Sequence, residues 1–349
     1  MKLTYSRYDL NFKVPGGTSR GVLRTKETYF LKIEKEGSFG VGEVALFRGL
    51  SYDDRPDFET RLSWLASNID KGREWCLDRL HEYPSIAFGL EQAFLSLESS
   101  RRFELFPSDF TKGTDSIDIN GLVWMGDKNF MKSQIHDKLN SGFKVIKLKI
   151  GAIDFNTEME LLGSIRKNFS ARDIELRVDA NGAFAPAEAM EKLKRLSEYD
   201  IHSIEQPIRQ GQYEEMAALC ESSPVPIALD EELIGLTESD KRENLLTKLN
   251  PQYLIFKPSL IGGMKVCSHW IDLCEKNNIG WWITSALESN VGLNAIAQYT
   301  YTLKNPMPQG LGTGGLFTNN IDSPLRVKQG ALYHDPRIKW GDTDQLFHE

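Results

Sequence analysis

Residues 143–150 read FKVIKLKI, a short apolar run with lysines at positions 147 and 149. Because side chains alternate along a β-strand, Lys147 and Lys149 share one face while Leu148 points the other way. Similar apolar runs recur downstream, and most are separated by segments with the apolar spacing of a helix. Strand–helix units repeated every 25 to 30 residues are typical of a (β/α) barrel.

The repeating pattern begins near residue 116. The apolar runs occupy residues 117–122, 145–150, 174–178, 202–204, 225–229, 253–256 and 279–283. An open, doubly wound sheet has the same local pattern, but no Gly-x-Gly-x-x-Gly loop follows the first run. A dinucleotide-binding fold is therefore disfavoured relative to a barrel.

The first hundred residues have a different organisation. Residues 28–34 predict a strand, residues 36–38 a turn, and residues 41–46 the return strand. From residue 57 to about 102 the spacing becomes helical, with Ile86, Leu90, Phe94 and Leu97 on one helix face. Strands followed by helices, without alternation, indicate a small α+β domain.

Charged residues stand where the predicted barrel strands end. Lys149, Asp179, Glu205, Asp230 and Lys257 follow one another at intervals of 25 to 30 residues. The carboxyl ends of barrel strands converge on one mouth, where the active sites of barrel enzymes lie. Three carboxylates without a Cys or His partner favour a hard divalent cation, Mg²⁺ or alternatively Mn²⁺.

The lysines suggest what such a metal site would do. Lys147 and Lys149 would flank the carboxylates on one side, and Lys257 would face them across the barrel. A bound cation and neighbouring ammonium groups favour the neutral form of a lysine, which can then act as a base. The metal would offset the charge that forms when the carbon next to a carboxylate loses its proton. The pattern predicts a Mg²⁺-dependent enzyme that acts on a small-molecule carboxylate.

Composition excludes several other classes of function. The chain has 349 residues, 26% of them charged, and a formal net charge of -7. It has no run of five or more lysines and arginines, so neither nucleic acid nor an anionic membrane is an expected partner. The N-terminus lacks the apolar core of a signal peptide, and Cys76, Cys220, Cys267 and Cys274 lack metal-site spacing. A cytoplasmic protein with free thiols is predicted, and a homo-oligomer remains open.

The ordered set of strand-end residues resembles the enolase superfamily and, within it, the muconate-lactonizing-enzyme subgroup. The resemblance covers nearly the whole chain. It rests on Lys147-x-Lys149, Asp179-x-Asn181, Glu205-Gln206-Pro207, Asp230-Glu231 and Lys257 followed by residues 260–263. It implies an α/β fold, with an α+β capping domain at residues 1–113 and a modified (β/α)7β TIM-type barrel at 114–319. Residues 320–349 would pack back on the capping domain, and Asp179, Glu205 and Asp230 would bind Mg²⁺.

Further motifs resemble the o-succinylbenzoate synthase family of menaquinone biosynthesis. They are Arg177-x-Asp179-x-Asn181 and residues 42–45, 285–292 and 310–314. That family dehydrates 2-succinyl-6-hydroxy-2,4-cyclohexadiene-1-carboxylate. The resemblance implies that Lys149 is the acid/base of a syn elimination. Lys257 would be the stabilising cation on the opposite face, and Lys147 would orient Lys149 or contact the substrate.

Several residues are candidates for substrate contacts. Ser285 and Gly312 are expected to meet the carboxylates of the substrate. Arg177 shares a face with Asp179 and is expected to point into the barrel, as a substrate contact or as a balancing charge. Asn181 is either a helix cap or part of the site. Thr18 and Arg20 lie in a glycine-flanked loop, residues 16–21, which could close over the site, as could residues 47–49.

Two lysines on opposite faces of a carbon also suit racemisation. An N-succinylamino-acid racemase or a dipeptide epimerase of the same superfamily is therefore the main alternative. Dipeptide epimerases typically carry Asp-x-Asp after the seventh barrel strand, where this chain has Ser285-Ala286-Leu287. A sugar-acid dehydratase would need a histidine at a late strand end, where the chain has none. A non-catalytic metal-binding barrel would not need all three lysines.

Overall fold

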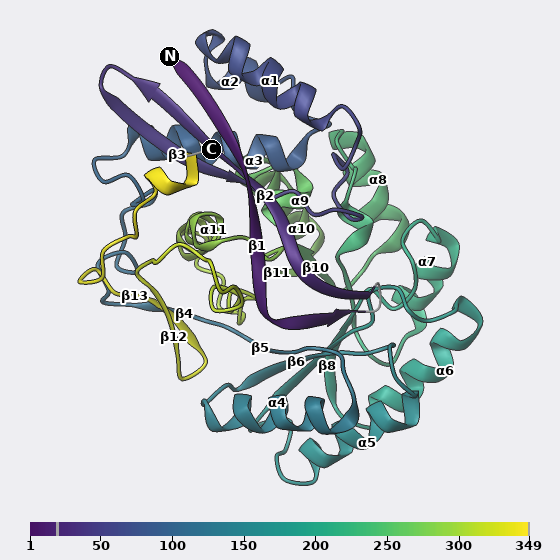
Figure 1. Cartoon of the computed structure of the whole chain (residues 1–349). Helices are drawn as coiled ribbons and strands as arrows, with labels where there is room; N and C mark the ends of the chain where they lie inside the picture. Colours follow the sequence, from purple (N-terminus) through teal and green to yellow (C-terminus); the bar gives the residue numbers. More distant parts are fainter. Residues whose placement is uncertain (19–20, 348–349) are drawn as a thin grey trace.

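A computed structural model describes residues 1–18 and 21–347 of the chain (Figure 1). The N-terminal part is an antiparallel sheet of β1 (Lys2–Thr18), β2 (Gly21–Lys35) and β3 (Ser38–Val44), in that order. Helices α1 (Phe58–Asn68), α2 (Arg73–Leu77) and α3 (Pro84–Glu98) follow. The strands and the helix predicted within residues 28–46 and 86–97 are confirmed.

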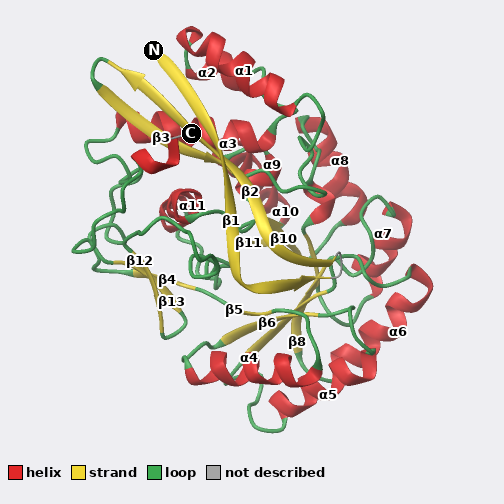
Figure 2. Cartoon of the chain, in the orientation of Figure 1, coloured by secondary structure: helices red, strands yellow, loops and turns green. Residues whose placement is uncertain are grey.

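The second part is a curled parallel sheet surrounded by helices (Figure 2). Its order is β11-β10-β9-β8-β7-β6-β5. The strands are β5 (Gly121–Val123), β6 (Val145–Lys149), β7 (Glu175–Asp179), β8 (Ile201–Glu205), β9 (Ile227–Leu229), β10 (Tyr253–Phe256) and β11 (Gly280–Ile283). The helices are α4 (Lys128–Asn140), α5 (Phe155–Arg166), α6 (Pro186–Ser197), α7 (Tyr213–Ser222), α8 (Ser239–Leu249), α9 (Pro258–Ile261), α10 (Met264–Asn277) and α11 (Asn290–Thr302).

The eighth position of the barrel is reduced to a short segment. Gln309 and Gly310 form isolated parallel bridges with Ile119 and Thr284, and so connect the two ends of the seven-stranded sheet. Seven strand–helix units followed by this segment confirm the predicted (β/α)7β architecture. We call the junction between β5 and β11 the seam.

Local sequence explains where many barrel helices begin and end. Asp127 and Asp154 accept hydrogen bonds from the backbone N–H groups of Phe130 and Thr157, and so cap the N-termini of α4 and α5. Proline occupies the first turn of α6 and α9, where its missing N–H costs no helical hydrogen bond. Asn250 and Asn278 end α8 and α10 in the left-handed conformation, which Asn adopts more readily than most residues.

The apolar run at residues 117–122 forms two elements rather than one strand. Its first half is β4 (Ser116–Asp118), which pairs with the C-terminal hairpin of β12 (Leu325–Lys328) and β13 (Ala331–His334). Only the second half, β5, joins the barrel. The segment before the hairpin contacts the N-terminal sheet, where Phe317 forms a bridge with Phe12 of β1.

All four cysteines are free, as predicted, and all four are buried. None of the described helices is long and apolar enough to cross a membrane.

A buried carboxylate connects the N-terminal sheet to the barrel. Glu43 of β3 is fully buried and accepts hydrogen bonds from the backbone N–H groups of Ser289 and Gly292, both at 2.9 Å. It also accepts from the hydroxyls of Thr28 and Ser289. These backbone groups belong to the N-terminus of α11, where the helix dipole favours a negative charge. Gly292 has no Cβ, which leaves room because a Cβ there would lie 2.8 Å from Glu43 Oε2.

We expect Glu43→Gln to lower the free energy of unfolding by about 2 kcal/mol, because the amide cannot accept all the hydrogen bonds made to the carboxylate. The change can be measured by urea unfolding at equilibrium. Glu36→Gln, at the exposed β2–β3 turn, is the matched control and should have almost no effect. Equal losses in the two variants would contradict this role of Glu43.

Candidate active site

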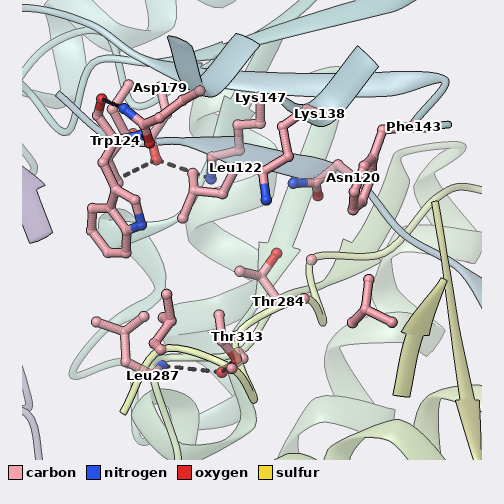
Figure 3. A pocket seen from close by; sticks show the side chains of 18 of the residues that line it. Asn120, Leu122, Trp124, Lys138, Phe143, Lys147, Asp179, Thr284, Leu287 and Thr313 are labelled. Atoms are coloured by element: carbon pink, nitrogen blue, oxygen red, sulfur yellow. Dashed lines mark hydrogen bonds and ion pairs between the residues drawn. The ribbon is translucent and has the colours of Figure 1, made fainter. Parts of the chain in front are cut away.

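A cavity of about 1020 Å³ opens at the carboxyl ends of the barrel strands (Figure 3). Barrel residues form one wall, and the ends of β1 and β2 reach over the barrel to form part of the opposite wall (Figure 1). The lining includes Lys147, Lys149, Asp179, Asn181, Lys257, Ser285 and Gly312 from the barrel, and Lys13, Val14, Leu23 and Phe47 from the N-terminal part.

Strand register places the predicted functional residues side by side. Lys149 of β6 pairs with Asp179 of β7, and Asp179 pairs with Glu205 of β8. Asp230 and Lys257 follow the last residues of β9 and β10. The three carboxylates are almost completely buried, with exposures of 0% for Asp179 and 2% for Glu205 and Asp230.

Ammonium groups lie between these carboxylates. Lys147 Nζ is 2.9 Å from Asp179 Oδ2 and also pairs with Glu205. Lys149 Nζ is 2.9 Å from Asp179 Oδ2 and donates to Asn181 Oδ1 at 2.6 Å. Across the barrel, Lys257 pairs with Asp230. We refer to these three lysines and three carboxylates as the charge cluster.

The two aspartates of the charge cluster have opposite pKa shifts. Burial alone would raise the pKa of Asp179, but the neighbouring ammonium groups, Lys147 foremost, hold it well below its usual value. Burial raises the pKa of Asp230 to about 8, and the nearby carboxylates of Glu231 and Glu205 add to the rise against the opposing effect of Lys257.

The donor set suits an oxygen-coordinated dication. Glu205 Oε1 is buried and accepts no hydrogen bond from any described residue. Glu205 Oε1, 3.7 Å from Lys257 Nζ, together with the oxygens of Asp179 and Asp230, would suit the oxygen coordination that Mg²⁺ prefers. In the described ranges, 1–18 and 21–347, the acidic side chains do not form a compact metal cluster as they stand. Lys147 and Lys257 bind the carboxylates directly instead.

Two residues in strained backbone conformations support the charge cluster. Asn181 has a φ of 45°, and its side chain bonds Lys149 on one side and Glu231 on the other. Gln206 has a φ of 42°, and its Oε1 accepts from the backbone N–H of Asp230 at 3.3 Å. Left-handed backbone in non-glycine residues is costly and tends to occur at functional sites. The side chain of Asn181 thus lies within the site.

Ser285 lies at the cavity wall with all its hydrogen-bonding capacity in use. Its Oγ donates to Glu288 Oε2 at 2.6 Å and accepts from Thr313 Oγ1 at 2.8 Å and from the backbone N–H of Leu287 at 3.1 Å. Glu288 is fully buried and also accepts from Ser259 Oγ at 2.6 Å. Glu288 therefore joins α9, which follows β10, to the loop after β11.

The structure places Arg177 deeper in the barrel than the residues that line the cavity. Its guanidinium donates to Glu175 Oε1 at 2.7 Å and to Pro308 O at 2.9 Å, and lies 4.4 Å from the centre of the Trp282 ring. Of the other candidates for substrate contacts, the side chain of Thr18 and the whole of Arg20 lie outside the described residues.

Sequence reasoning missed one prominent lining residue, Trp124. It follows β5 directly, so it occupies a strand end like the charged residues that were recognised. Its ring packs edge-to-face on Phe12 and lies against Gly16, where a Cβ would be only 3.1 Å away. The strand-end argument would have found it had it been applied to aromatic residues as well.

Comparisons with known proteins find relatives that match nearly the whole chain. The o-succinylbenzoate synthase of Desulfotalea psychrophila is 48% identical, over 95% of this chain and 98% of that protein. The crystal structure of MenC from Desulfotalea psychrophila LSv54 has a TM-score of 0.85 at 45% identity, covering 95% of this chain and 99% of that one. The L-Ala-D/L-Glu epimerase of Bacillus subtilis is more distant, at 23% identity over 61% of this chain and 55% of that protein.

The muconate lactonizing enzyme from Pseudomonas fluorescens shares the fold, with a TM-score of 0.80 at 21% identity over 99% of this chain and 97% of that one. The family model described as enolase C-terminal domain-like matches residues 131–337. The resemblance predicted from the strand-end residues is therefore confirmed, and the chain belongs to the enolase C-terminal domain-like family.

Proposed function

We propose that this protein is a Mg²⁺-dependent o-succinylbenzoate synthase that dehydrates 2-succinyl-6-hydroxy-2,4-cyclohexadiene-1-carboxylate. The main support is the 48% identity, over nearly the full length of both chains, to a protein of that name. The charge cluster adds chemical support, because Lys149 and Lys257 approach the mouth from strands on opposite sides of the barrel.

Asp179, Glu205 and Asp230 would hold the metal ion, which when bound supplies Lewis-acid stabilisation of the substrate carboxylate. Lys149 would take the proton from the carbon next to that carboxylate, so that the C–H bond breaks and its electrons move toward the carboxylate. The C–O bond to the hydroxyl group then breaks, and Lys149 returns the proton to the departing oxygen. Water leaves from the same face, and the ring becomes aromatic.

Lys257 would stabilise the electron-rich ring and carboxylate from the opposite face. Burial alone would lower the pKa of Lys257, but Asp230 and Glu205 outweigh it and raise the pKa above its usual value. Lys257 therefore stays protonated at neutral pH and keeps its positive charge. A cation close to a ring face is attracted to the ring electrons.

Lys147 would have a positioning role. It is 5% exposed and pairs with both Asp179 and Glu205, so it holds these carboxylates in place. Asn181 and Asp179 together fix the amine of Lys149 beneath the cavity.

The principal alternative is proton transfer without elimination, as in a racemase or epimerase. The two opposed lysines suit either reaction. A dipeptide epimerase would need an accessible carboxylate for the substrate ammonium after the seventh strand. Glu288 does not meet this need, because it is fully buried and bonded to Ser259 and Ser285. An N-succinylamino-acid racemase, whose substrate has no free ammonium, fits the site better.

Lys149→Ala should lower kcat for dehydration by at least about a thousandfold, because general base catalysis is lost. Initial rates with the cyclohexadiene substrate measure this loss. Lys144→Ala, at an exposed lysine just before β6, should retain the wild-type rate. A Lys149→Ala protein with wild-type turnover would rule out Lys149 as the base.

Substrate choice separates the two reactions. The wild-type protein should dehydrate the cyclohexadiene with a higher kcat/KM than it racemises N-succinylamino acids. Product absorbance follows the first reaction, and polarimetry follows the second. Racemisation in the absence of any dehydration would replace our proposal with the alternative.

EDTA should abolish activity, and added Mg²⁺ should restore it. Glu205→Gln should weaken Mg²⁺ binding at least about tenfold, because one anionic ligand is lost. Isothermal titration calorimetry measures the affinity directly and independently of turnover. Asp240→Asn, on the exposed side of α8, is the control. Unchanged affinity in the Glu205→Gln protein would exclude Glu205 as a ligand.

A further inference from the structure

The cavity extends beyond the charge cluster into a side chamber. We define the side chamber by Asn120, Leu122, Lys138 and Phe143, which line the cavity together with Gly142 and Gln329 at its outer end. It lies beside the seam, where Ile119, next to Asn120, bridges to Gln309. Neither the proposed dehydration nor the metal site uses these residues.

Lys138 enters the side chamber from the last turn of α4. Its aliphatic stem crosses Gly121, where a Cβ would lie 3.0 Å from Lys138 Cδ and 3.1 Å from the Phe143 ring. The ammonium lies 5.2 Å from the centre of that ring. Lys138 Nζ makes neither a hydrogen bond nor an ion pair with any residue in the described part of the chain. Within the described part of the chain, the half-buried cation is thus influenced by Asp137 but forms no direct ion pair.

Asn120 provides a second polar group without a partner. It is 6% exposed, and its backbone N–H donates to Gln309 O at 2.9 Å, which fixes its position. Its side-chain Oδ1 is buried and has no hydrogen-bond partner among the described residues. Figure 3 shows the Asn120 amide and the Lys138 ammonium directed into the same space.

Asn120 Oδ1 is an acceptor and calls for a donor, whereas the Asn120 N–H groups and the Lys138 ammonium call for the acceptor oxygens of a ligand. An ammonium has three N–H donors, and a carboxamide has two more together with its acceptor oxygen. Even if Asn120 Oδ1 rotated to accept from Lys138, two donors of Lys138 would still need acceptors. A single cation beside an amide and the apolar side chains of Leu122 and Phe143 matches one carboxylate on a short carbon chain. A phosphate dianion would be poorly matched by one lysine with Asp137 nearby.

We propose that the side chamber is a second binding subsite for small aliphatic carboxylates, separate from the charge cluster. Lys138 pairs with one carboxylate oxygen and Asn120 donates its amide N–H to the other. Leu122 and Phe143 cover the carbon chain. The proposal does not depend on which reaction the barrel mouth performs.

Succinate is the probe, titrated into the full-length protein by isothermal titration calorimetry. The wild type should show two classes of site, one at the barrel mouth and one in the side chamber. Lys138→Met should weaken the side-chamber class at least about tenfold, because a charge-assisted hydrogen bond is lost. Lys132→Met, at an exposed position of the same helix, is the matched control and should bind as the wild type does. Lys149→Ala should weaken succinate binding only at the barrel mouth and leave the side-chamber class unchanged.

Asn120→Asp tests the second group with almost no change in shape. The new carboxylate would pair with Lys138 and repel the ligand, so the side-chamber class should disappear. Thermal unfolding of each variant confirms that it is folded, and wild-type crystals soaked in succinate provide a test that needs no variant. Density between Lys138 and Asn120 would support the subsite. A single class of site unaffected by Lys138→Met, or succinate density at the mouth alone, would overturn it.

Discussion

The mutual neutralisation of buried charges at the barrel mouth is the constraint on which the rest of the structure depends. A carboxylate or an ammonium withdrawn from water alone costs several kcal/mol, and a partner at close range offsets this cost. Lys147, Lys149 and Lys257 meet Asp179, Glu205 and Asp230 at such distances. Because these groups come from different strands, their charges are balanced only when the parallel sheet has its native register. The site is therefore a product of the complete barrel.

The N-terminal sheet adds a wall to the cavity, and its attachment is as specific as the barrel register. Glu43 accepts from two backbone N–H groups at the N-terminus of α11, and α11 follows directly after the loop that contains Ser285 and Glu288. The same loop is joined through Glu288 to Ser259, two residues after Lys257. A chain of buried hydrogen bonds thus runs from the sheet that covers the site toward the lysine on its far side.

The sequence predicted the barrel and its charge cluster because both repeat with a fixed period. Asp179, Glu205 and Asp230 could be recognised from spacing alone, since parallel strands deliver their ends to one place. The division of residues 117–122 between β4 and β5 could not be predicted, because β4 pairs with a hairpin some two hundred residues away. The position of Lys138 in the cavity could not be predicted either, because Lys138 belongs to a helix and reaches the cavity only by crossing Gly121. Such contacts depend on packing, which leaves no periodic signal.

The barrel closes at the seam. Elsewhere the barrel strands share ladders of hydrogen bonds, whereas Gln309 and Gly310 link its two ends through isolated bridges. The ring is thus closed by a two-residue segment, Gln309 and Gly310, rather than by a full eighth strand. Asp179 and Glu205 end strands, and Asp230 follows one, in the middle of the sheet and away from both of its ends. Closure of the ring therefore rests on residues other than those that bear the carboxylates.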